Sequence, residues 1–168
     1  MSPLARVARV TRLRAFTALG FALFLLPLAA SACELVLSEH RSGRELVRLP
    51  FGGAPPAARI AFTHSVLGTP VADRYEWRLD GAAWRAHLVE ERYEGDGYGL
   101  PNAAAPGETL VREGQGWRLA LDRVVDPLVV LPLPAQRMRV VVEAGEPVLL
   151  GSLTSASVQL RVSGCSVG

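Results

Sequence analysis

Residues 71–93 read VADRYEWRLDGAAWRAHLVEERY, and this stretch decides the fold. Two runs rich in aromatic and β-branched or long side chains, residues 71–79 and 84–93, are separated by a turn at Asp80-Gly81. Asp-Gly between two such runs is a strong signal for a β-hairpin, because the turn types that suit hairpins favour this dipeptide. We therefore predict a pair of antiparallel strands here.

Similar short runs, broken by glycine and proline, lie on both sides of this hairpin. In chain order they are residues 34–38, 45–50, 58–64, 108–112, 116–121, 139–142, 148–150 and 158–162. Residues 128–133 are apolar, but prolines at 127, 132 and 134 argue against an interior strand there. Short strands at this spacing, without helical periodicity, predict an all-β fold: a single small antiparallel β-sandwich or partly open β-barrel over residues 33–168.

The first 32 residues have the pattern of a signal peptide. Four arginines fall within residues 1–14, and a 14-residue apolar run, AFTALGFALFLLPL, occupies residues 15–28. Spanning a bilayer core takes about 20 residues, and Ala30-Ser31-Ala32 supplies the small residues that signal peptidase requires. We expect residues 1–32 to be a cleaved signal peptide and the protein to be exported to the periplasm. An uncleaved anchor is the alternative.

The excess of basic residues in the chain comes from this predicted signal peptide. All 18 basic residues are arginine, and without residues 1–32 the count is 14 Arg against 16 Asp plus Glu, a formal charge of 14 − 16 = −2. A domain with that balance lacks the basic surface that binding of nucleic acid requires. We therefore expect no nucleic-acid partner. The three histidines lack the spacing of metal ligands, so we expect neither a metal nor a cofactor.

Cys33 and Cys165 are the two cysteines of the chain. In an oxidising compartment they could form a disulfide that ties the first strand to the last. Cys33 would also be the first residue after cleavage, which opens a second interpretation, a lipid on Cys33 that holds the protein to the membrane. Two free thiols are the third. We predict the disulfide.

The densest polar cluster follows residues 58–64. It contains Phe62-Thr63-His64-Ser65-Val66, and a second segment, GYGLP at 97–101, lies in a glycine- and proline-rich loop at residues 95–106. His64 and Asp73 could form an acid–base pair, although no nucleophile signature is present. The alternative is that His64 and Ser65 only cap the strand and hydrogen-bond the turn.

Two segments resemble one family. His64-Ser65-Val66 with Thr69-Pro70-Val71 resembles the HSV-x-x-TPV signature of the domain of unknown function numbered 1850, and VEERY (89–93) before GYGLP is similar to its "ETRY…GxGLP" block. Where the family has an aromatic residue and Glu after TPV, this chain has Ala72 and Asp73. The resemblance covers about residues 34–162. It implies a small exported or membrane-tethered β-rich domain without established enzymatic activity, often found alongside tripartite transporters of the TAXI type (TRAP transporters).

We therefore expect an exported accessory or binding module of such an uptake system. Its partner would be the transporter membrane subunit or the periplasmic solute-binding protein. The expected functional patch comprises His64, Ser65, Thr69, Pro70, Asp73, Gly97, Tyr98, Gly99, Leu100 and Pro101. Two alternatives from other classes are a small periplasmic hydrolase that uses His64 and Asp73, and a purely structural envelope domain. On balance, the sequence favours a binding protein over an enzyme.

Overall fold

The computed structural model describes residues 33–143 and 145–165, and the predicted signal peptide therefore lies outside the described residues. The described strands are β1 (Glu34–Glu39), β2 (Glu45–Pro50), β3 (Ala57–Thr63), β4 (Pro70–Asp80), β5 (Ala83–Glu94), β6 (Thr109–Glu113), β7 (Gly116–Val125), β8 (Leu128–Val130), β9 (Arg139–Val141), β10 (Val148–Leu149) and β11 (Val158–Ser163). Two short helices, η1 (Pro134–Gln136) and α1 (Leu150–Leu153), complete this part of the chain. No helix within it is long and apolar enough to cross a membrane.

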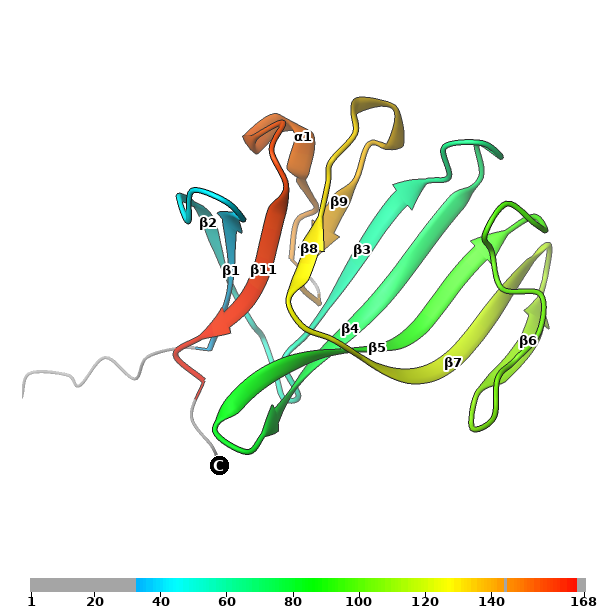
Figure 1. Ribbon diagram of the computed structural model, residues 1–168, viewed down its shortest axis with the longest axis horizontal. Coiled ribbons are helices and arrows are strands. Elements are labelled where there is room, and N and C mark those ends of the chain that lie inside the picture. The colour runs from blue at the N-terminus through cyan, green and yellow to red at the C-terminus, as the bar shows by residue number, and fades with distance from the viewer. Residues whose placement is uncertain (1–32, 144, 166–168) are drawn as a thin grey trace, which may run out of the picture. The chain divides into compact units, whose positions relative to one another are not determined.

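The predicted hairpin is the centre of the larger sheet. Strands β4 and β5 pair antiparallel from Val71↔Tyr93 to Asp80↔Ala83, and Gly81 adopts a φ of 62° in the turn between them. The other strands extend this pair into a seven-stranded sheet of order β10-β9-β3-β4-β5-β7-β6. Figure 1 shows this sheet running from β9 through β4 and β5 to β6.

The smaller sheet has the order β2-β1-β11-β8 and is also antiparallel. The two sheets share one hydrophobic core, in which Leu35 and Leu160 of the small sheet join Ile60 and Trp77 of the large one. Where one face of a sheet is buried, alternate residues of a strand face the core, as Tyr75 and Trp77 do on β4 and Leu119 and Leu121 on β7. The predicted all-β sandwich is confirmed, and the sheets are not closed into a barrel.

The disulfide prediction is confirmed as well. Cys33 and Cys165 are bonded, with their Cα atoms 4.2 Å apart, at the end of the small sheet where β1 begins and β11 has just ended. The register pairs Glu34 with Ser163 next to the bond. Since Cys33 is bonded in this structure, its sulfur is not free to carry a lipid.

The proline-flanked apolar run 128–133 contains a strand, β8, that pairs with β11 alone. It is an edge strand, where missing N–H donors are tolerated, and not an interior one, as the prolines predict. One strand boundary differs from its prediction. The predicted strand 148–150 stops at Leu149, because Leu150 begins the short helix α1 and is fully buried.

Candidate functional site

Two carboxyl groups interrupt the apolar inner face of the large sheet. Asp73 on β4 and Glu91 on β5 are register partners. Their row continues to Ile60 on one side and Leu119 on the other, both buried in the core. Along β4 itself, Asp73 lies between Val71 and Tyr75, which are buried on the same face. The two acids therefore occupy positions that the fold otherwise gives to apolar side chains.

A β-bulge places Glu91 on this face. The register of β5 against β4 shifts between Leu88 and Glu90, which pair with the adjacent Tyr75 and Arg74, so that Val89 is the extra residue. A bulge of this kind reverses which residues face inward. Ala86 and Leu88 point to the core before it, and Glu91 and Tyr93 do so after it.

Burial sets the protonation of this pair. Burial, and then the negative charge of Glu91, raise the pKa of Asp73 to about 7. Burial also raises the pKa of Glu91, although the nearby Arg123 opposes the shift. Among the described residues, Asp73 Oδ1 and Glu91 Oε2 are buried without a hydrogen-bond partner. Buried acceptors of this kind are rare, since each one loses its hydrogen bonds to water.

The turn that follows β3 is closed by the His64 side chain. The His64 Nδ1 atom accepts hydrogen bonds from the backbone N–H groups of Val66 and Leu67, at 3.3 and 3.2 Å. The His64 backbone N–H donates to the Thr69 carbonyl at 2.8 Å. Because Nδ1 is an acceptor here, the ring carries its proton on Nε2. His64 thus holds residues 64–69, which we call the 64–69 turn.

The loop after β5 is held against the same strands. The Tyr93 hydroxyl donates to the Pro101 carbonyl at 2.5 Å, and the Thr69 hydroxyl donates to the Glu94 carbonyl at 2.7 Å. Tyr98 has a φ of 54°, in the left-handed region that favours glycine, between two glycines that are also left-handed. The loop 95–106 is therefore a shaped segment tied to β5, and the 64–69 turn is tied to the end of β5 where this loop begins.

These segments enclose one cavity of about 240 Å³, which we call the inner pocket. Its lining comprises Phe62, His64, Ser65, Val71, Asp73, Glu91, Tyr93, Tyr98, Gly99, Leu100, Pro101 and Gln136. Seven members of the predicted patch are thus gathered around one cavity: His64, Ser65, Asp73, Tyr98, Gly99, Leu100 and Pro101.

The other three predicted patch residues do not line the inner pocket. Thr69 is engaged with the Glu94 carbonyl, Gly97 accepts a hydrogen bond from the Leu100 N–H, and Pro70 lines a different hollow with Trp117. The structure adds Glu91 and Tyr93, which sequence reasoning did not select. Both lie in the VEERY segment (89–93) that carries the resemblance, but that segment does not show which face of the sheet Glu91 occupies.

The proposed acid–base pair is not assembled in this structure. The hydrogen bonds of the His64 side chain go to the Val66 and Leu67 backbone, and Asp73 Oδ1 has no partner within the described part of the chain. Both side chains line the inner pocket, but no hydrogen bond joins them there. The geometry is that of a polar cavity beside a fixed turn.

Fold and pocket together define a small β-sandwich domain with one polar cavity between two anchored loops. The family model for the domain of unknown function DUF1850 matches residues 59–148, which run from β3 to β10 and include every residue that lines the inner pocket. The chain belongs to this family. No curated protein and no solved structure matches the chain.

Proposed function

We propose that this protein is an exported accessory binding module of a TAXI-type (TRAP) solute-uptake system, and that the inner pocket is its contact site. One observation carries the proposal: two buried carboxyl oxygens, on Asp73 and Glu91, lack hydrogen-bond partners beside a cavity. A ligand or partner group that donates hydrogen bonds would satisfy them. Such unsatisfied acceptors reduce stability when the site is empty, so a binding role explains their presence.

The rim of the inner pocket has the character of a protein contact. Tyr98 is 71% exposed and Val66 is 62% exposed, and they lie on the two segments that border the cavity. Exposed aromatic side chains beside a recess are frequent centres of binding energy at protein interfaces. The rim therefore fits a protein partner, for which we propose the transporter membrane subunit or the solute-binding protein.

Export is supported by two features of the chain. The first 32 residues carry the basic, apolar and small-residue pattern of a signal peptide. The disulfide between Cys33 and Cys165 is of the kind that forms and persists in oxidising compartments. Both fit a protein that acts in the periplasm.

Fractionation combined with affinity isolation tests this function. The full chain, tagged at its C-terminus and expressed at its natural level, should appear in the periplasmic or membrane fraction. After mild cross-linking in cells, it should isolate a transporter membrane subunit or a solute-binding protein, as identified by mass spectrometry. Tyr98→Ala should reduce that recovery, whereas Val124→Ala, which truncates a 53%-exposed side chain on β7, should not. A cytoplasmic location, or equal recovery with Tyr98→Ala, contradicts the proposal.

A further inference from the structure

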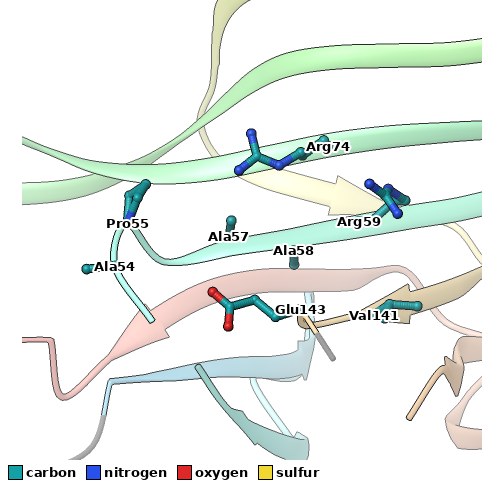
Figure 2. Close-up of a pocket in the computed structure, with 8 residues that line it drawn as sticks. All are labelled: Ala54, Pro55, Ala57, Ala58, Arg59, Arg74, Val141 and Glu143. Carbon is teal, nitrogen blue, oxygen red and sulfur yellow. The ribbon is translucent and has the colours of Figure 1, made fainter. Parts of the chain in front are cut away.

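A second cavity lies on the outer face of the large sheet. It measures about 230 Å³ and is lined by Ala54, Pro55, Ala57, Ala58, Arg59, Arg74, Val141 and Glu143, as Figure 2 shows. We call it the outer pocket. It shares no lining residue with the inner pocket. Arg59, Arg74 and Val141 form one cross-strand row, on the face opposite to the row that contains Ile60 and Asp73.

Two arginines line one side of this cavity. Arg59 and Arg74 are register partners on β3 and β4. Like charges directly opposite each other on neighbouring strands are destabilising unless they are neutralised. The Arg74 Nη1 atom donates to Glu76 at 2.6 Å, whereas Arg59 forms no ion pair with any carboxylate of residues 33–143 and 145–165. The guanidinium of Arg59 therefore has no carboxylate partner among the described residues, whereas that of Arg74, beside it, has Glu76.

An acid faces the same cavity from another segment. Glu143 follows β9, and it makes no ion pair or hydrogen bond with the rest of the described chain. Its carboxylate lies against Gly52 and Gly53, and a Cβ added at Gly52 would come within 2.7 Å of Glu143 Oε2. In Figure 2, Ala57 lies between the Glu143 carboxylate and the Arg74 guanidinium.

The cavity therefore has opposite charges on its two sides that do not pair with each other. We propose that the outer pocket binds a small zwitterion, with its carboxylate at Arg59 and Arg74 and its ammonium group at Glu143. Arginine binds carboxylates through paired N–H donors, and a carboxylate accepts hydrogen bonds from an ammonium group. α-Amino acids have this charge arrangement. The cavity volume suits one molecule of that size, and the methyl group of Ala57 supplies an apolar part of its lining.

A calorimetric titration of the full chain, kept in detergent micelles because of its apolar residues 15–28, tests this site. The probes are L-alanine, L-leucine and L-glutamate, with propionate and ethylamine as controls that carry a single charge. We expect at least one amino acid to bind, and to bind about tenfold or more tighter than either control. Arg59→Gln and Glu143→Gln should each weaken binding about tenfold, which is the usual effect of losing one charge-assisted contact.

Arg161→Gln is the matched control, because Arg161 is an exposed arginine on β11 of the other sheet. It should leave the affinity unchanged, and circular dichroism should show that all three variants fold. No binding of any amino acid at roughly 10 mM overturns the proposal. Equal binding of propionate, an unchanged affinity in Glu143→Gln, or an equal loss in Arg161→Gln also overturns it. Since no residue is shared with the inner pocket, none of these outcomes bears on the transporter contact.

Discussion

Asp73 and Glu91 face each other across β4 and β5 on the core side of the sheet, each with a buried carboxyl oxygen that has no hydrogen-bond partner in the described structure. Neither acid has a cation bonded to it, although Arg123, whose guanidinium is bound to Glu108 at 2.7 Å, lowers the pKa of Glu91. The pair is therefore costly to the fold whenever both groups are ionised.

Because ionisation of the buried pair destabilises the folded protein, the free energy of unfolding depends on pH. The pKa of Asp73 is about 7 in the folded protein, against about 3.9 in an unfolded chain. Between these values the folded state binds more protons than the unfolded state, so the free energy of unfolding falls as the pH rises from about 4 to about 7. The slope from one group is at most about 1.4 kcal/mol per pH unit.

Asp73→Asn should remove that slope. We expect the variant to be more stable than the wild type at pH 8 and similar to it at pH 4, as measured by urea unfolding at both values. Glu91→Gln should instead lower the pKa of Asp73, because it removes one of the two causes of the shift. A loss of stability in Asp73→Asn at pH 8 would show that the carboxylate has a stabilising partner.

We expect the His64 side chain to stabilise the 64–69 turn and to contribute little to the hydrophobic core. His64→Ala removes the acceptor for the Val66 and Leu67 N–H groups, so these amides should exchange with solvent faster, while the melting temperature changes little. Hydrogen exchange measured by NMR detects this directly. His40→Ala, which removes an exposed ring bonded to Gln159, should leave both amides unaffected. Global unfolding of His64→Ala would instead assign His64 a role in folding.

The Tyr93 hydroxyl should control how firmly the 95–106 loop is held. Tyr93→Phe keeps the ring in the core and deletes only the hydrogen bond to the Pro101 carbonyl. We expect a loss of about 1 kcal/mol in unfolding free energy and faster hydrogen exchange in the loop. Tyr98→Phe, which alters an exposed hydroxyl, is the control and should change neither quantity. Unchanged exchange in Tyr93→Phe would mean that the loop is held by other contacts.

The disulfide should provide a large part of the stability. It closes a segment of 132 residues between Cys33 and Cys165. A crosslink over that length restricts the unfolded chain and stabilises the fold by about 4–5 kcal/mol in the chain-entropy model. Cys33→Ser with Cys165→Ser should show that loss in urea unfolding. Dithiothreitol should destabilise the wild type and leave the double variant unchanged, and an equal effect on both would contradict this origin.

The sequence predicted the parts of this structure that depend on local signals. Asp80-Gly81 between two strand-like runs fixed the central hairpin, and two cysteines at opposite ends of the domain indicated the disulfide. Glu91 was missed for a physical reason. Strict alternation from the inward-facing Trp84 places Glu91 on the outer face, and the bulge at Val89, opposite β4, reverses this. A bulge depends on the partner strand and leaves no simple mark in the sequence.

The outer pocket was missed because it joins segments far apart in the chain. Gly52-Gly53 shows no motif by itself, and only the path of β9 brings Glu143 to it. The grouping of the 64–69 turn with the 95–106 loop was predictable, since both segments adjoin the ends of the same hairpin. The Thr69 hydroxyl donates to the last carbonyl of β5, and the Gly97 carbonyl accepts from the Leu100 N–H. No sequence pattern distinguishes such backbone contacts from a place in the lining of a cavity.

The central claim is that this domain meets its partner at the inner pocket, and site-specific photo-cross-linking tests it most directly. A photoreactive phenylalanine analogue placed at Tyr98, on the pocket rim, should give a cross-linked product in cells that contains a subunit of the transporter. The same analogue at Val124, which is also exposed but lies on β7 away from the cavity lining, should give none. Efficient cross-linking from Val124, or none from Tyr98, would contradict the account.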